Sequence, residues 1–476
     1  MLTVVLSAVS FLLGVALATL TGWSVPGFIF FAGVGLLWWR PQWGAVLIAF
    51  LLGFARLQLW QEQVPSADVL GKNVIEATLE EDWGKKDGKW NWLVSTDSGE
   101  LLLETSAYLD LKYGETVELK GTVETTEALS QNISYLHYLQ RHRVWLVMEN
   151  PRLTVLAPPP ISFLGSLAEL SDRLTARLQI LLSEPEASFA VGLLLGKRQN
   201  MDADLQEAFQ TVGLTHIVAI SGSNIAMVVV CFFILFSFLP FQKRLICSGL
   251  GVLCFVLLVG PSAAVLRAGL MGILSLVGLY TGRRSQAFFG LLWSAVLMVI
   301  VNPLVLTYDV GFQLSFASTF GILTLTPVLE SYVPKRIFMR EALLLTLAAQ
   351  LMTFPFIVFY FGRFSWITLP ANLLVAPLIP LAMGASAAAL IFGTPAAALA
   401  WTFLWLIEKI ALFCAAVPGV QIEFTVSPFL FITMLVSLVF SLLFFYKSKL
   451  DRAFLRGYGA RLSKELNREC ETRERR

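Results

Sequence analysis

An apolar run at residues 214–239 is interrupted by residues that can hydrogen bond or relax the backbone: Ser221, Gly222, Ser223 and Asn224. Backbone that departs from a regular helix at bilayer depth persists only where protein or a water-filled cavity satisfies its polar groups. The SGSN tetrad therefore indicates a place where something hydrophilic passes or binds. The alternative is that the serines bond back to the preceding turn and Gly222 eases helix packing.

Two charged side chains lie in later apolar runs. Arg267 lies in the segment PSAAVLRAGLMG, and Asp309 begins the segment DVGFQLSFAS, which also contains Gln313. An ionisable group inside a membrane span is costly to bury and suggests a functional site by default. Two interpretations stay open: an Arg267–Asp309 ion pair, or an unpaired Arg267 in a wet cavity, where its guanidinium would contact a passing phosphate.

The sequence contains no catalytic or metal-binding pattern. The three histidines (His137, His142 and His216) do not form HExxH or a related motif, and there is no GxxxxGK[ST] loop for a nucleotide. The cysteines lack metal or redox spacing. A Ser221–His216 hydrolytic pair lacks the strand–elbow context that such a nucleophile needs. We predict no metal, no cofactor and no enzymatic activity; His216 stays a candidate because it precedes the tetrad closely.

The elements that must position these residues are membrane helices. Hydrophobic residues make up 56% of the 476, charged residues 14%, and the mean hydropathy is +0.71, whereas soluble domains carry roughly a quarter charged residues. Most apolar runs approach the roughly 17–25 residues that cross a bilayer as a helix. We predict a polytopic α-helical membrane protein of about twelve spans, from these runs: 2–20, 27–39, 43–60, 214–239, 245–260, 263–281, 286–301, 310–327, 342–361, 373–393, 396–417 and 428–446.

Basic residues indicate the orientation of these spans. They collect at Arg40, at Lys243–Arg244, at Arg283–Arg284, at 335–340 and from Lys447 onward. With twelve spans all of these sites fall on one side, which the positive-inside rule assigns to the cytoplasm. We therefore predict that both termini lie in the cytoplasm and residues 61–212 outside it. Arg267 and Asp309 then lie near the outer face.

Residues 61–160 have the pattern of a soluble β domain. The run ETVELKGTVE at 115–124 alternates in polarity, and WLV at 92–94 is a second strand candidate. About a hundred residues with several short strands predict a small β-barrel of the OB type, a fold that often binds single strands. However, this segment has nine basic and sixteen acidic residues, a net charge of −7, which argues against DNA binding by the insert.

We predict five parts along the chain. They are three N-terminal helices (1–60), the external OB-like domain (61–160), amphipathic interfacial helices (161–212), a helical core (213–446) and a basic cytoplasmic tail (447–476).

Four ordered segments in residues 186–380 resemble the ComEC-type competence proteins. They are GLLLGKRQNMDADLQEAFQTVGLTHIVAISGSNIAMVV, PSAAVLRAGLMG, NPLVLTYDVGFQLSFASTFGI and FGRFSWITLPANLLVAPLIP. The three leading helices and the external β insert also occur in that family. The resemblance departs in one respect, because many members end in a metallo-β-lactamase-like domain that this sequence lacks.

The resemblance implies an inner-membrane channel that takes single-stranded transforming DNA into the cytoplasm during natural competence. It implies that a nuclease, a periplasmic DNA receptor and a cytoplasmic helicase or strand-binding protein are separate partners, beside membrane lipids. The implied channel or structural-core positions are His216, Ser221, Gly222, Ser223, Asn224, Arg267, Asp309, Gln313 and Asn372.

Two other interpretations remain open. A small-solute or lipid transporter would use broken helices at its binding site, and PLIP at 377–380 and Asn372 fit such breaks. A membrane enzyme built on the tetrad and Asp309 is the third, and it lacks a convincing base. Glu408 and Lys409 fall within an apolar run and have no role in any of these interpretations.

Overall fold

The computed structural model describes residues 2–445 apart from 22–40, 62–70, 72–73, 87, 98, 110, 127–132, 161, 198–200, 219, 261, 283–286, 338 and 443. The predicted span at 27–39 and the predicted tail at 447–476 lie outside the described residues. The chain divides into two compact units. The first unit is residues 1–316 with 365–420, and the second unit is residues 317–364 with 421–476.

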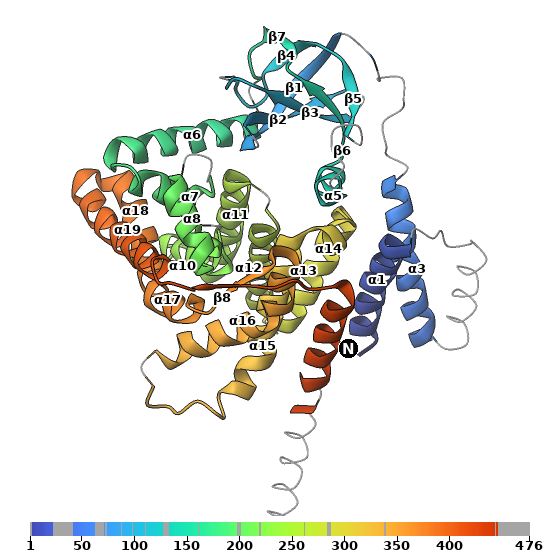
Figure 1. Cartoon of the computed structure of the whole chain (residues 1–476), viewed down its shortest axis with the longest axis vertical. Coiled ribbons are helices and arrows are strands. Elements are labelled where there is room, and N and C mark those ends of the chain that lie inside the picture. Colours follow the sequence, from blue (N-terminus) through green and yellow to red (C-terminus); the bar gives the residue numbers. More distant parts are fainter. Residues whose placement is uncertain are drawn as a thin grey trace, which may run out of the picture. The chain divides into compact units, whose positions relative to one another are not determined.

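Most of the first unit is helical (Figure 1). Its helices are α1 (Leu2–Thr21), α3 (Pro41–Gln61), α5 (Ile133–Arg141), α6 (Phe163–Leu181), α7 (Glu186–Leu195), α8 (Ala203–Val212), α9 (Thr215–Val218), α10 (Gly222–Leu235), α11 (Phe241–Val259), α12 (Ala263–Tyr280), α13 (Ala287–Val301), α14 (Val305–Tyr308), α17 (Thr368–Val375), α18 (Leu378–Phe392) and α19 (Thr394–Ala415). Helix α15 (Val310–Leu329) begins in this unit.

The described residues include seven helices long and apolar enough to cross a membrane, or up to eight if the bent pair α17–α18 is one span. This number makes the chain a multi-pass membrane protein. The seven correspond to seven of the twelve predicted runs, and α17–α18, bent by 42°, corresponds to an eighth. Three further runs form shorter apolar helices at Ala45–Trp60, Ala287–Val301 and Pro428–Leu442. The total of twelve crossings is therefore not confirmed, because three helices are short and one run is not described.

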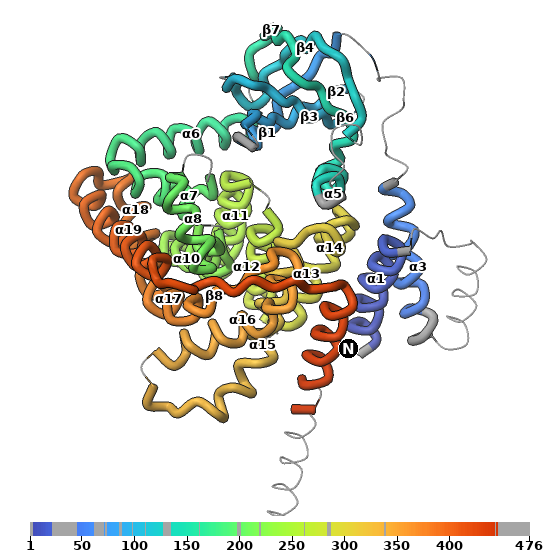
Figure 2. Tube along the Cα trace, in the orientation of Figure 1, coloured from blue at the N-terminus to red at the C-terminus, as the bar shows by residue number. Residues whose placement is uncertain are grey.

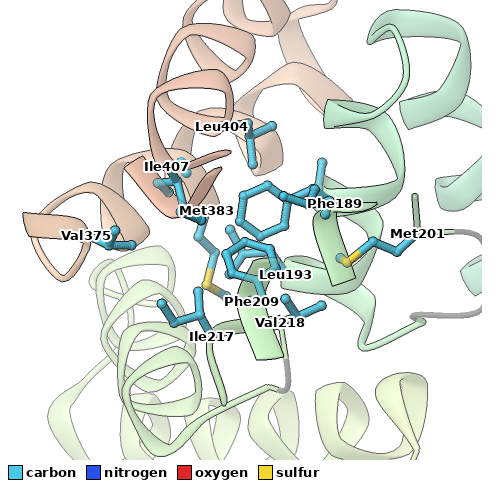
Figure 3. Packing of buried hydrophobic residues seen from close by; sticks show 14 of the residues in the cluster. Phe189, Leu193, Met201, Phe209, Ile217, Val218, Val375, Met383, Leu404 and Ile407 are labelled. Carbon is cyan, nitrogen blue, oxygen red and sulfur yellow. The ribbon is translucent and has the colours of Figure 1, made fainter. Parts of the chain in front are cut away.

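Helices α7 to α9 pack with α17 to α19 around the largest cluster of buried apolar side chains (Figure 3). Phe189 of α7 and Phe209 of α8 lie with ring centroids 5.4 Å apart at its centre. Helices α18 and α19 form a hairpin that contacts α6 and α7, so segments far apart in the sequence lie side by side (Figure 2). This packing fixes the end of α9, where the SGSN tetrad follows.

The predicted β segment forms one seven-stranded sheet. Its order is β5-β6-β3-β2-β1-β4-β7, and only β3 and β6 pair in parallel among the described strands. Trp92, Leu101, Leu119 and Met148 are fully buried on its inner face. The strands are β1 (Val74–Lys86), β2 (Lys89–Thr96), β3 (Gly99–Thr105), β4 (Thr116–Lys120), β5 (Val123–Thr125), β6 (Val144–Glu149) and β7 (Arg152–Ala157).

The second unit contains the remainder of α15, α16 (Arg340–Phe361) and β9 (Gln421–Glu423), with β8 (Arg363–Ser365) at its boundary. Aromatic side chains hold it together. The ring of Phe354 meets those of Phe364 and Phe424 edge to face, and Phe359 stacks on Phe431 with centroids 4.4 Å apart.

Candidate functional site

The SGSN tetrad lies at a break between two helices of one apolar span. Helix α9 ends at Val218, and α10 begins at Gly222 after an extended Ser221 (φ −99°, ψ 171°). The whole segment Thr215–Leu235 has the length and hydropathy of a single span. The sequence-based expectation of irregular backbone inside an apolar run is therefore confirmed at these residues.

The polar side chains of the tetrad bond to one another. The Ser221 and Ser223 hydroxyl oxygens are 2.7 Å apart, and the Ser221 hydroxyl donates to Asn224 Oδ1 at 3.1 Å. Asn224 is buried, and its Nδ2 donates to the carbonyl of Leu193 in α7 at 3.4 Å. The tetrad is thus anchored to the packed core through Asn224, while Ser223 is exposed.

Arg267 faces the start of α10 from α12. Its side chain is 7% exposed, and its Nη2 lies 3.3 Å from the position that a Cβ on Gly222 would occupy. Its guanidinium carbon is 5.9 Å from the centroid of the Phe316 ring. Its Nε has no hydrogen-bond partner, and no carboxylate of the described residues pairs with it. A buried cation without a counter-ion is costly, which makes Arg267 a candidate functional residue.

Asp309 pairs with a residue that sequence reasoning missed. Its Oδ2 forms an ion pair with Arg141 Nη1 at 2.7 Å, so of the two interpretations left open for Arg267, the Arg267–Asp309 ion pair is wrong. Its Oδ1 accepts from the backbone amide of Phe312 at 3.0 Å and thereby caps the first turn of α15. Asp309 is 7% exposed and belongs to this structural contact.

The partner Arg141 ends α5, the helix that follows β5 (Figure 1). Two further contacts join α5 to the membrane helices: Asn302 Nδ2 donates to the carbonyl of Arg141 at 2.8 Å, and the His137 ring stacks on Tyr308 with centroids 3.8 Å apart. We call these three interactions the α5 contact. The only sequence signal for it is the basic run Arg141–Arg143 within an acidic insert.

The remaining predicted residues lie in two different parts of the fold. His216 hydrogen bonds to the Asn372 side chain and to the Gly213 backbone, which joins α9 to α17. Thr368 Oγ1 donates to the carbonyl of Val212 at 2.7 Å and strengthens the same junction. Gln313 instead donates to the carbonyls of Leu306 and Thr307, at 3.2 and 2.8 Å, and steadies the turn before α15.

The structure thus brings most of the predicted residues into one region and separates two of them. The first group is Ser221, Gly222, Ser223, Asn224 and Arg267 at the α9–α10 break, with His216 and Asn372 at the preceding helix. The second group, Asp309 and Gln313, supports the α5 contact and the start of α15.

Comparison with known proteins identifies the class. Residues 193–449, more than half of the chain, match the sequence model of the competence protein family, so the chain belongs to that family. It is 26% identical to the ComE operon protein 3 of Bacillus subtilis (strain 168) over 281 residues, which are 58% of this chain and 35% of that protein. It is 29% identical to an uncharacterized protein of Aquifex aeolicus (strain VF5) over 194 residues, 40% of this chain and 44% of that protein.

The family match covers the α9–α10 break and Arg267. The chain spans less than half the length of each of these two curated relatives. No solved structure matches the chain. The four segments that resemble ComEC-type proteins lie almost entirely in the matched region, so the resemblance is confirmed.

Proposed function

We propose that this protein is a channel of the bacterial inner membrane through which single-stranded transforming DNA enters the cytoplasm. The observation that carries the proposal is the broken span at α9–α10. It places hydroxyl and amide groups beside Arg267, a buried cation without an acidic partner among the described residues. A conduit for a polyanion needs hydrogen-bonding walls and a positive potential, and both occur here. Membership of the competence protein family supports it.

The proposal includes the topology and the five parts predicted from the sequence. Twelve crossings place every basic loop in the cytoplasm, together with both termini, and place residues 61–212 outside. The helical core at 213–446 would form the conduit, with the three helices of 1–60, the interfacial helices of 161–212 and the tail of 447–476 around it.

An OB-like closure of the external β domain is part of the proposal. The antiparallel strands β1-β2-β3 continue into a parallel β3–β6 pair. Segment 116–125 pairs with β1 through β4 and with β6 through β5, and only Gly121 and Thr122 separate these strands. One segment that supplies the strand at one end of the sheet (β5) and the strand next to the other end (β4) supports a barrel. Its net negative charge favours a scaffold function over DNA binding.

Partners complete the proposal. A separate nuclease would convert duplex DNA to a single strand, a periplasmic receptor would deliver it, and a cytoplasmic helicase or strand-binding protein would supply the motive force.

Labelled duplex DNA given to cells that lack the gene tests this function. The cells are complemented with the wild type, Arg267→Ala or the control Arg173→Ala, which removes a side chain that is 72% exposed. We expect cells without the chain to accumulate nuclease-protected DNA outside the inner membrane and no cytoplasmic strand. Arg267→Ala should lower the cytoplasmic strand and Arg173→Ala should not. Normal arrival of strands without the chain would contradict the proposal.

One observation favours a second candidate, a transporter of small solutes or lipids. The α17–α18 pair is bent by 42° next to Asn372, and broken helices form the binding sites of many transporters. This candidate predicts normal DNA uptake in cells without the chain, so the same assay separates the two.

A further inference from the structure

The start of α10 has free hydrogen-bond donors. No side chain caps this 14-residue helix, and the backbone amides of Gly222 and Ser223 donate to no group among the residues that the structure describes. The amides of Asn224 and Ile225 are the first that are used, since both donate to the carbonyl of Ser221. A helix N-terminus with free amides carries a partial positive charge and attracts anions.

Arg267 adds a full positive charge at the same point. Among the described residues, and leaving aside the chain neighbours and backbone of α10 itself, Arg267 Nη2 is the one atom within 4 Å of the Cβ position on Gly222. The side chain is more than nine-tenths buried. The acid that could have neutralised it, Asp309, is bound to Arg141 and to the amide of Phe312.

The hydroxyl pair supplies a further donor. Ser221 donates to Asn224, which the carbonyl of Leu193 holds in place. Each hydroxyl carries one proton and either can be the donor between Ser221 and Ser223, so the exposed Ser223 can turn its proton outward when Ser221 donates to it instead of to Asn224. Amides, a hydroxyl and a guanidinium together form the donor set that tetrahedral oxyanions accept.

We propose that the N-terminus of α10, the Ser223 hydroxyl and Arg267 form a binding site for one phosphodiester group of a single DNA strand. The inference rests on the proposed function and deepens it by placing one backbone contact. The absence of a side chain at Gly222 is part of the site, because a methyl group there would stand between Arg267 and the helix amides. The site would bind the charged backbone of the strand and not its bases, because a conduit must accept strands of any sequence.

Binding of a fluorescent dT20 strand to the full-length protein in a phosphate-free maltoside detergent tests the inference. Anisotropy is recorded against salt concentration for the wild type, Arg267→Lys, Arg267→Ala, Gly222→Ala and the control Arg173→Ala. We expect Arg267→Ala to weaken binding about tenfold or more, since charge-assisted bonds to phosphate are strong. It should also lower the slope of log K against log salt by about 0.7, the value for one phosphate contact on a single strand. Arg267→Lys should keep the slope and bind with intermediate affinity.

The Gly222→Ala variant distinguishes loss of the binding site from loss of protein stability. Alanine favours the helix and keeps every charge, so unfolding should not become easier. Weaker dT20 binding by a protein of unchanged melting temperature is therefore the expected result. A strand with a neutral methylphosphonate backbone should bind the wild type and Arg267→Ala equally.

Three outcomes would contradict the proposed site or the proposed function. Equal affinity and equal salt slope for the wild type and Arg267→Ala, with dT20 still bound, would overturn the site and leave the conduit standing. No dT20 binding by any form, together with normal DNA uptake without the chain, would overturn the proposed function. Tightly bound phospholipid that is lost only from Arg267→Ala, with dT20 binding unchanged, would assign the site to a lipid headgroup and overturn the inference.

Discussion

Asp309 shows that a buried carboxylate is held by the cation that the fold brings to it. It pairs with Arg141, and the two side chains are 10% and 16% exposed. Removing one partner of a buried pair leaves the other charge uncompensated, which typically costs 3–5 kcal/mol. We therefore expect Arg141→Ala to lower the free energy of unfolding by about 3 kcal/mol. Thermal or denaturant unfolding of the purified protein measures this loss.

The double variant Arg141→Ala/Asp309→Asn should recover part of the stability, because no buried charge remains unpaired. The exposed pair Arg173–Glu169, with its atoms 2.6 Å apart, is the matched control. The coupling energy between Arg173 and Glu169, taken from the single variants and the double variant, should stay below about 1 kcal/mol. Equal coupling in both pairs would show that burial does not strengthen the Arg141–Asp309 interaction.

At the scale of elements, His142 lies next to the α5 contact, and we expect its protonation state to affect the stability of the protein. Burial, reinforced by the neighbouring Arg141, lowers the pKa of His142 from 6.5 to about 4. The ring lies against Trp83 and Tyr138, and its Nε2 is 2.8 Å from Arg141 Nη2, where only a neutral histidine can accept. Because the folded pKa is lower than the unfolded one, this stabilisation is present above about pH 6.5 and is lost progressively toward pH 4.

We expect the melting temperature of the wild type to fall between pH 7 and pH 4 more steeply than that of His142→Gln. A glutamine does not titrate and its amide oxygen can accept from Arg141. Glu100 contributes in the opposite direction, since burial and then Glu80 raise its pKa to about 7, so its stabilisation is lost as the pH rises toward that value. The two proteins compared therefore both carry Glu100→Gln and differ only at residue 142. Parallel pH profiles for both proteins would contradict the role of His142.

Helices α1 and α3 make a close contact through two glycines. A Cβ on Gly14 would collide with the carbonyl oxygen of Phe50, and one on Gly53 would lie 2.9 Å from the amide of Val15. Small residues let membrane helices approach closely. Gly53→Val should therefore separate the helices and destabilise the protein by about 1–3 kcal/mol. Gly384→Val, where a Cβ meets nothing within 4 Å, is the control and should melt like the wild type.

The elements were predictable from the sequence to different degrees. Hydropathy predicted the long helices because a bilayer forces apolar runs of fixed length, and alternation predicted the strands that contain Trp92 and Val117. The break at Ser221 was predictable because polar residues interrupt a run. The partner of Asp309 was not, since Arg141 lies 168 residues away in a domain whose docking no local pattern encodes. That Asp309 is not the partner of Arg267 follows from this contact with Arg141.

At the scale of the whole molecule, charge is separated along the chain. The insert carries a net charge of −7, whereas the segments flanking many spans are basic. In the proposed topology the negative insert lies outside the cytoplasm and would repel a DNA strand from its surface, whereas the buried Arg267 in the membrane region would attract it. Both effects would favour passage over retention outside. They require the insert to lie outside the cytoplasm, which labelling can test.

Single cysteines in a cysteine-free background report that orientation. Asp97→Cys and Arg173→Cys lie on exposed residues of the proposed outer segment, and Lys335→Cys lies on an exposed residue between α15 and α16. A membrane-impermeant maleimide should label the first two in intact spheroplasts and label Lys335→Cys only after permeabilisation, because basic loops stay in the cytoplasm. The reverse labelling pattern would mean that the orientation of the protein in the membrane is the opposite of the predicted one. Labelling of Lys335→Cys and Asp97→Cys from the same side would instead require an even number of crossings between residues 97 and 335. The predicted number of spans in that part of the chain would then be wrong. The α9–α10 break and Arg267 would remain as described.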